Sequence, residues 1–284
     1  MAITKVTTPV TGFESAVDIG LKIPVGTNSN LPTGIEGMIR NDTDEDSGGA
    51  KSTTAITFFN GLNWKYFNST FIASPIMYLD ASNTTSYPGT GTTWYDLTSN
   101  GNNGTISNAT WDSLGYFQFN GSSSYISTSL TWPGSTTLSF SCWAKITTMG
   151  VNQMIIADFN SAGTNASYRF AIKIDSANYL QVGTNNGGLG TFHSMGYAYG
   201  FINVYKNITV TVSGTQVKVY VNGTQFGSTA SQGTALSTGV EPFQIGAYGP
   251  GSNKQNLNGE ISKVRFFTDV LTLAEITALY NEGK

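Results

Sequence analysis

Cysteine and histidine are nearly absent from this sequence of 284 residues, each occurring once. With Cys142 alone, the chain cannot form an internal disulfide or a cysteine-based zinc site. Cys142 shares one face of a period-two pattern with four apolar residues, Leu138, Phe140, Ala144 and Ile146. A catalytic cysteine needs a histidine partner, and nothing in the sequence joins Cys142 to His193. We therefore expect Cys142 to be a small core residue of a strand.

Charge is also scarce, and long apolar runs are missing. Charged residues make up 11% of the chain, against roughly a quarter in typical globular domains, so hydroxyls and amides must solvate the surface. The net charge of −3 excludes the basic footprint of a nucleic-acid-binding protein. No apolar run approaches the ~20 residues of a membrane helix. The Met1 terminus, MAITKVTTPVTG, has no apolar stretch typical of a secretory signal, so we expect a protein made and assembled inside a cell.

Short alternating strands fill the chain from Met77 onward. Turn residues separate them at short intervals, which predicts an all-β sandwich or jelly roll. The clearest strand patterns are YFQF, YIST, TLSFSCWAKI, QMIIADF, YRFAIKI, YLQVGT, NITVTVSG, QVKVYVNGTQFGS, PFQIGAY and EISKVRFF.

A helix is predicted only at the end of the chain. Thr272 followed by Glu275 is the spacing of a capping box at a helix N-terminus. Leu273, Ile276 and Leu279 recur at helical spacing and define one apolar face. We expect this face to cover apolar side chains on an open end or face of the sandwich.

Residues 1–70 differ in pattern from residues 71–284, and we take them as a small β-rich N-terminal module. MIRND reads as a strand, and AITFFNGLNWKYFN reads as a hairpin because Asn-Gly lies between apolar and aromatic arms. So short a segment buries little surface by itself and needs a partner, either its own copies or another protein.

The larger part of the chain resembles the laminin-G-like (concanavalin-A-like) jelly roll. The resemblance rests on four ordered pieces: the Trp-bearing strand; a strand pair ending in the YVNG turn; the IG strand of PFQIGAY; and NGEISKVRFFTDVLTLAEITALYNEG. It covers about residues 76–284 and implies an all-β sandwich closed by a short helix. Such domains often hold one calcium ion at the rim, for which Asp80 or Asp158 would be the ligand; no other cofactor is implied.

The segment IGLKIPVGTNSNLPTGIEGMIRNDT, followed by ITFFNGLNWKYF, is similar to a short module of bacteriophage fibre and appendage proteins. This chain departs from that pattern by an inserted acidic segment, Asp42–Lys51. The resemblance implies a homotrimeric virion protein, assembled in the host cytoplasm and displayed outside the cell. Residues 1–70 would contact other virion proteins, and the jelly roll would face outward.

Catalysis is not expected. Glucanases with this architecture use paired carboxylates from an E-x-D-x-x-E strand motif, and the sequence contains no such motif. The aspartates and glutamates of residues 71–284 are scattered singly. We therefore predict no catalytic residues and no enzyme activity.

Glycan binding needs only a shallow surface with exposed aromatic rings and amide or hydroxyl partners. The segment GTFHSMGYAYGF is the best candidate, because its aromatics and histidine lie among glycines in a predicted loop. Core packing is the competing interpretation for each aromatic residue, Trp94 included. The full candidate set is Trp94, Tyr95, Asn102, Asn103, Phe192, His193, Tyr197, Tyr199 and Tyr248.

The sequence thus predicts a virion fibre, decoration or spike protein. Its jelly roll would contact a host-surface glycan or protein. A purely architectural capsid or tail component remains an alternative. A free carbohydrate-binding module or glycosidase is a third.

Overall fold

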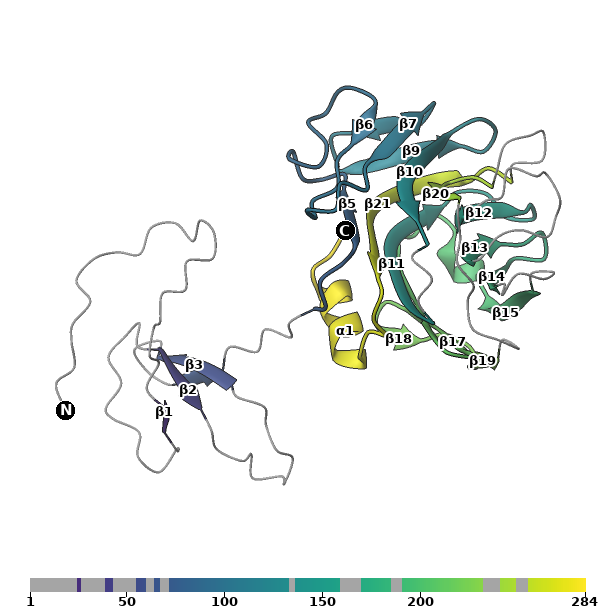
Figure 1. Cartoon of the computed structure of the whole chain (residues 1–284). Coiled ribbons are helices and arrows are strands. Elements are labelled where there is room, and N and C mark those ends of the chain that lie inside the picture. The colour runs from purple at the N-terminus through teal and green to yellow at the C-terminus, as the bar shows by residue number, and fades with distance from the viewer. Residues whose placement is uncertain are drawn as a thin grey trace. The chain divides into compact units, whose positions relative to one another are not determined.

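The computed structural model divides the chain into two compact units, Met1–Ser69 and Thr70–Lys284 (Figure 1). In the first unit the structure describes four short strands. In the second it describes residues 72–132, 136–158, 170–184, 191–231, 241–248 and 255–284.

The four strands of the first unit pair into one sheet in the order β1-β2-β3-β4. Strands β3 and β4 are antiparallel, with Thr57 opposite Tyr66 and Phe59 opposite Trp64, so the predicted hairpin is confirmed. The inserted acidic segment lies outside the described residues beyond Asp42. The strand bounds are β1 (Val25–Gly26), β2 (Ile39–Asp42), β3 (Ala55–Phe59) and β4 (Trp64–Tyr66).

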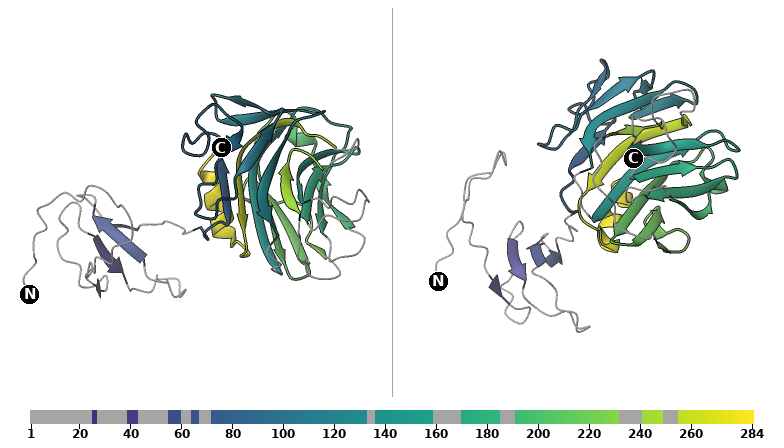
Figure 2. Two further views of the ribbon diagram at one scale, coloured as in Figure 1. Left: turned by 45° about the horizontal axis from the view of Figure 1, so that its top comes forward. Right: turned by 45° about the vertical axis from the view of Figure 1, so that its right-hand side comes forward.

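The second unit contains two antiparallel sheets (Figure 2). The first has eight strands in the order β15-β14-β13-β12-β20-β10-β7-β6, so β15 and β6 lie at its opposite edges. Its strands are β6 (Thr93–Trp94), β7 (Gly104–Ser107), β10 (Tyr125–Thr131), β12 (Gln153–Asp158), β13 (Phe170–Ile174), β14 (Tyr179–Thr184), β15 (Thr191–Tyr197) and β20 (Pro242–Ile245).

The second sheet has nine strands, with β18-β17-β16-β11-β21-β9-β8 in order; β19 pairs with β17, and β5 pairs with β21. The two long central strands, β11 and β21, pair along most of their length. The strands are β5 (Met77–Asp80), β8 (Thr110–Asp112), β9 (Tyr116–Asn120), β11 (Thr137–Ile146), β16 (Lys206–Ser213), β17 (Gln216–Val221), β18 (Thr224–Gln225), β19 (Ala230–Ser231) and β21 (Asn258–Phe267).

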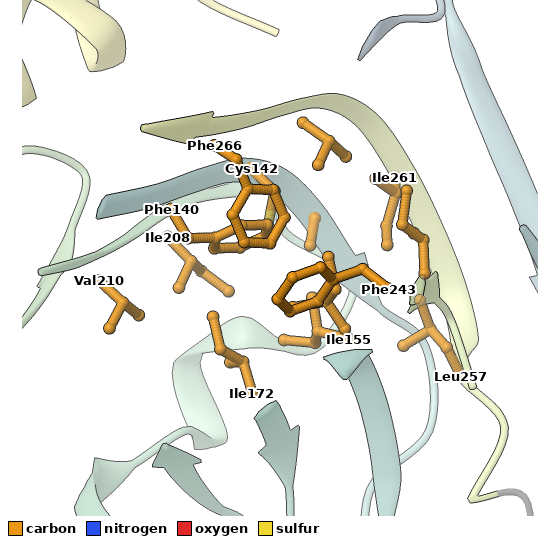
Figure 3. Packing of buried hydrophobic residues seen from close by; sticks show 14 of the residues in the cluster. Phe140, Cys142, Ile155, Ile172, Ile208, Val210, Phe243, Leu257, Ile261 and Phe266 are labelled. Atoms are coloured by element: carbon orange, nitrogen blue, oxygen red, sulfur yellow. The ribbon is translucent and has the colours of Figure 1, made fainter. Parts of the chain in front are cut away.

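The hydrophobic core lies between these two sheets. Figure 3 shows Phe140 and Phe266 of the nine-stranded sheet directed toward Phe243 and Ile172 of the eight-stranded sheet. Cys142 is buried in this core, and the alternating face predicted for its strand is confirmed. The all-β sandwich expected from the strand pattern is therefore the observed fold.

A tight turn after β17 follows from two residues with positive φ. Asn222 has φ 52° and Gly223 has φ 79°, a left-handed pair that favours Asn-Gly. The turn brings Val221 opposite Thr224 and starts β18. The predicted YVNG turn thus occurs where the sequence placed it.

The C-terminal helix α1 (Leu273–Asn281) packs on the outer face of the nine-stranded sheet. Ile276 and Leu279 are buried there against Phe267 and Tyr220. The prediction for Leu273 is wrong: its side chain is 60% exposed, because it lies in the first helical turn on the side away from the sheet. In the part of the chain that the structure describes, no helix has the length and apolar character needed to cross a membrane.

The predicted capping box is present. The Thr272 hydroxyl accepts from the Glu275 N–H, and a Glu275 carboxylate oxygen accepts from the Thr272 N–H at 2.8 Å. The other Glu275 oxygen accepts from the Ala73 N–H at 2.8 Å. Burial favours the protonated form of Glu275, but the hydrogen bonds from Thr272 and Ala73 outweigh it and lower the pKa of this carboxyl. Glu275 therefore joins the helix to the first residues of the sandwich.

We expect Leu279→Ala to lower the free energy of unfolding by about 2–5 kcal/mol, because it leaves a cavity beneath the helix. Leu273→Ala is the matched control and should change stability by less than about 0.5 kcal/mol, since Leu273 is exposed. Urea denaturation of both variants measures the difference. Equal effects of the two substitutions would contradict this placement of the helix.

Candidate functional site

The segment GTFHSMGYAYGF is not the loop that we predicted: most of it forms an edge strand, and its end, Tyr199–Phe201, forms a short 3₁₀ helix. Residues Thr191–Tyr197 make β15, which pairs with β14 along its whole length. Its glycine is required for packing: a Cβ at Gly196 would come within 2.6 Å of the Phe226 ring. Glycine here therefore permits close approach of a neighbouring segment and does not mark a loop.

Three exposed tyrosines gather where β14 begins and β15 ends. Tyr179 is 41% exposed, Tyr197 is 53% exposed and Tyr199 is 63% exposed. The rings of Tyr197 and Tyr199 are parallel, with centroids 6.0 Å apart and an interplanar angle of 1°. Tyr179 meets Tyr197 edge to face at 5.5 Å. We call these three residues the tyrosine platform.

Tyr179 was missing from our candidate residues, although the sequence held a signal for it. In YLQVGT the buried residues Leu180 and Val182 face the core, and alternation then places Tyr179 on the outer face. Its contact with Tyr197 depends on the pairing of β14 with β15, which places these two residues directly opposite each other. That pairing includes a bulge, which a single sequence does not reveal.

The turn between β13 and β14 fixes the base of the platform. One Asp175 carboxylate oxygen accepts from the N–H groups of Ala177 and Tyr179, each at 2.9 Å. Asn178 adopts φ 68°, and its carbonyl accepts from the Ala198 N–H at 2.8 Å. Tyr179 and the segment between Tyr197 and Tyr199 are therefore held by backbone hydrogen bonds.

A row of polar side chains lies beside the platform on the outer face. Lys173, Gln181 and Ser194 are neighbours across β13, β14 and β15. The Gln181 amide donates to the second Asp175 oxygen at 2.7 Å and to the Ser194 hydroxyl at 3.0 Å. Because a carboxylate only accepts, this contact fixes the amide orientation and directs the Gln181 carbonyl elsewhere. Ser194 accepts from Gln181 and so keeps its own proton for another partner.

Phe192 and Tyr248 cover a small apolar area on the same outer face. Both are half-buried against Met154, Ala157 and Ala171 of β12 and β13. The Lys173 ammonium lies 4.0 Å from the centroid of the Phe192 ring. Phe192 thus lies in the neighbourhood of the platform, but packing accounts for part of its surface.

His193 lies on the other face of β15. It pairs with the buried Val182, and one of its ring nitrogens lies 3.5 Å from the Thr184 hydroxyl. Burial lowers the pKa of His193, so the ring is neutral at pH 7. Successive side chains of a strand alternate, which separates His193 from Phe192 and Ser194.

The remaining candidates lie at the opposite edge of the eight-stranded sheet, near β6 and β7 (Figure 1). Trp94 is fully buried against Phe117, with ring centroids 4.8 Å apart, so the structure contradicts its placement at a binding surface. Strand β6 has only two residues, too few for alternation to predict which side chain faces the core. Tyr95 is 47% exposed and remains accessible.

Asn102 and Asn103 stabilise a loop around Asp96. The Asp96 carboxylate accepts from the N–H groups of Tyr78, Thr98 and Asn102 at 2.8–3.0 Å. The Asn102 amide donates to a backbone carbonyl at 2.7 Å, and the Asn103 carbonyl accepts from the Asp96 N–H at 2.8 Å. These hydrogen bonds give both asparagines a role in loop structure.

Asp80 and Asp158 are the two alternative candidates for a calcium ligand. They lie on strands of different sheets. The Asp80 carboxylate accepts from Ser82 and from the Tyr78 hydroxyl, with Lys263 at 3.9 Å. Asp158 is buried and accepts from the Phe170 N–H at 2.7 Å. Among the described residues no three histidine, cysteine or acidic side chains are grouped as metal ligands. The calcium ion that the resemblance implied, with Asp80 or Asp158 as a ligand beside backbone carbonyls, stays a prediction.

Comparison with known proteins agrees with this architecture. The family model described as the concanavalin A-like lectin/glucanases superfamily matches residues 119–277, more than half of the chain. No curated protein sequence matches.

Several solved structures share the fold at low sequence identity. The ligand-binding domain of botulinum neurotoxin serotype D, solved in complex with N-acetylneuraminic acid, aligns with TM-score 0.55 and 14% identity, covering 74% of this chain and 51% of that chain. The serotype G binding domain aligns with TM-score 0.55 and 13% identity, covering 74% and 51%. The Trypanosoma rangeli sialidase aligns with TM-score 0.55 and 12% identity, covering 86% and 44%.

The chain therefore matches about half the length of these structures, and at this identity they show the fold alone. The family model and the two-sheet architecture lead to one conclusion. This chain belongs to the concanavalin A-like lectin/glucanases superfamily.

Proposed function

We propose that this protein binds glycans, and that the tyrosine platform is the surface on which a sugar ring stacks. The observation that supports this most directly is the cluster of three solvent-exposed rings within 6.0 Å of their neighbours. Aromatic rings present flat apolar area at low conformational cost, and the C–H face of a pyranose matches such a surface. Membership of a lectin-containing superfamily, and a similar toxin domain solved with a bound sugar, support the proposal.

The neighbouring polar row suits this ligand class. The Gln181 carbonyl is an acceptor and the Ser194 hydroxyl is a donor, which together match a pair of sugar hydroxyls. Their mutual hydrogen bond and the contact of Gln181 with Asp175 pre-organise them, so little side-chain entropy is lost on binding.

We further propose that the protein binds without catalysis. Glycoside hydrolysis requires two suitably spaced carboxyl groups. Asp175, beside the platform, has both oxygens engaged by Ala177, Tyr179 and Gln181, which holds it as a structural group.

The role in a virion is part of the proposal and rests on the sequence of residues 1–70. In this account the N-terminal module joins a homotrimer to other virion proteins, and the sandwich of residues 71–284 is displayed at the particle surface to contact the host. The four short strands of the first unit are compatible with a small β module that completes its packing against copies of itself.

Tyr197→Ala and Tyr199→Ala should each weaken binding of the best-bound glycan by about tenfold, because each removes stacking area worth roughly 1 kcal/mol or more. A glycan array on the full chain identifies the ligand, and calorimetry on the variants measures the affinity. Tyr95→Ala is the matched control, since Tyr95 is comparably exposed at the opposite edge of the sheet and should leave affinity unchanged. Loss of binding in the control, or none in the platform variants, would contradict the site.

The full chain should be a trimer in solution, and a chain lacking residues 1–70 should be a folded monomer. The reason is that so short a module contains too few residues to bury its own aromatic side chains. Multi-angle light scattering distinguishes the two states. A trimer that persists after the deletion would place the interface in the sandwich instead.

A further inference from the structure

Lys173 stands out on the outer face of the eight-stranded sheet. It is the only lysine or arginine of the four strands β12–β15. Its neighbours across the strands are Met154 and the neutral Gln181. The neighbours of Lys173 across the strands are therefore uncharged, and the carboxylate whose charge acts on it is Asp175, which accepts from Gln181.

The Lys173 ammonium is held beside an aromatic ring but, in the part of the chain that the structure describes, has no carboxylate in an ion pair with it. It lies 4.0 Å from the centroid of the Phe192 ring, within the range of a cation–π contact. Within the described residues no aspartate or glutamate forms an ion pair with it. Burial lowers the pKa of Lys173, and the charge of Asp175 only partly opposes this effect. The ammonium has thus lost hydration without gaining a carboxylate.

The central strands of the other sheet show the contrast. Every lysine and arginine of β11 and β21 has an acidic partner. Lys145 lies 2.6 Å from Glu260, Lys263 lies 3.9 Å from Asp80, and Arg265 lies 2.6 Å from Glu282. Among the described residues, Lys173 shares the lack of an ion pair with the half-buried Lys206 and Lys218, but of these three lysines only Lys173 contacts an aromatic ring on the sheet that carries the tyrosine platform.

Lys173 and the tyrosine platform belong to one continuous surface. Gln181 and Ser194 connect them across the strands, and Tyr179 follows two residues from Gln181 on the same face. Phe192, under the ammonium, lies opposite Gly183, and Tyr197, in the platform, lies opposite Tyr179. Because β15 has a bulge, the two side chains are separated by four residues of β14, roughly 13 Å at the usual rise of a strand. A short oligosaccharide can reach both ends.

We propose that this surface binds an acidic oligosaccharide, one sugar ring stacking on the tyrosine platform and a carboxylate of a neighbouring sugar pairing with Lys173. The inference rests on the proposed glycan binding and adds the class of glycan. The carboxylate replaces the hydration that the ammonium has lost, and Phe192 beneath it keeps the side chain in place.

The test compares acidic glycans with their neutral methyl esters. The probe is an array of sialylated and galacturonate-containing oligosaccharides, each present as the free acid and as the methyl ester. We expect the full chain to bind the acids about tenfold more tightly than the esters, since a hydrogen bond to a charged group contributes roughly 1.5–3 kcal/mol. Lys173→Met should remove this difference while retaining ester binding, because methionine keeps the packing on Phe192.

Two control variants isolate the charge and its position. Lys173→Arg should preserve the preference for acids. Lys218→Met removes a half-buried lysine from β17 of the other sheet and should also preserve it. The inference is overturned if the wild-type chain binds esters as tightly as acids, or if Lys173→Met keeps the preference. If no glycan of either form binds in a manner that depends on Tyr197, the proposed function itself fails. If acids and esters instead bind equally well and both depend on Tyr197, the proposed glycan binding holds and only the preference for acidic glycans fails.

Discussion

Contact between phenylalanine rings of the two sheets determines which face of each strand is buried in this domain. Phe266 of the nine-stranded sheet meets Phe243 of the eight-stranded sheet with ring centroids 4.5 Å apart, and Phe140 and Phe170 surround this pair. Because these rings must face inward, the phase of each strand is fixed. Phe170 and Ile172 inside place Lys173 outside, and Leu180 inside places Tyr179 and Gln181 outside. The proposed binding surface is thus the outer side of strands whose register the core fixes.

The outer faces of the two sheets differ in chemistry. On the nine-stranded sheet, Tyr280 of helix α1 stacks on Trp143, and the cations of β21 are neutralised by acids. This face serves to hold the C-terminal segment. The outer face of strands β13–β15 of the eight-stranded sheet carries a lysine without an ion pair among the described residues, and the exposed tyrosines lie at its end. Closure of the fold and recognition are therefore assigned to different sheets.

The sequence predicted what local spacing determines. The face of Cys142, the capping box of Thr272 and the Asn-Gly turn after β17 all depend on residues within a few positions of one another, and all are confirmed. The errors have tertiary causes. Leu273 has helical spacing but lies in the first turn, away from the sheet, and Trp94 belongs to a strand too short to show alternation.

The candidate site was predicted only in part. Tyr197 and Tyr199 were found because they are aromatic and lie among glycines, although Tyr197 ends a strand and Tyr199 begins a short 3₁₀ helix. Tyr179 and Lys173 were missed because their relevance comes from the register in which β13, β14 and β15 pair, including a bulge that a single sequence does not reveal. Asp175 was missed for a similar reason: its importance lies in hydrogen bonds made after the turn has folded.

The central claim is that the rings of the tyrosine platform touch the sugar. Intermolecular NOEs between assigned tyrosine ring protons and the C–H protons of the best-bound glycan, measured on the full chain, test it directly. The account predicts NOEs to Tyr197 and Tyr199 and none to Tyr95. NOEs confined to tyrosines outside the platform would contradict it.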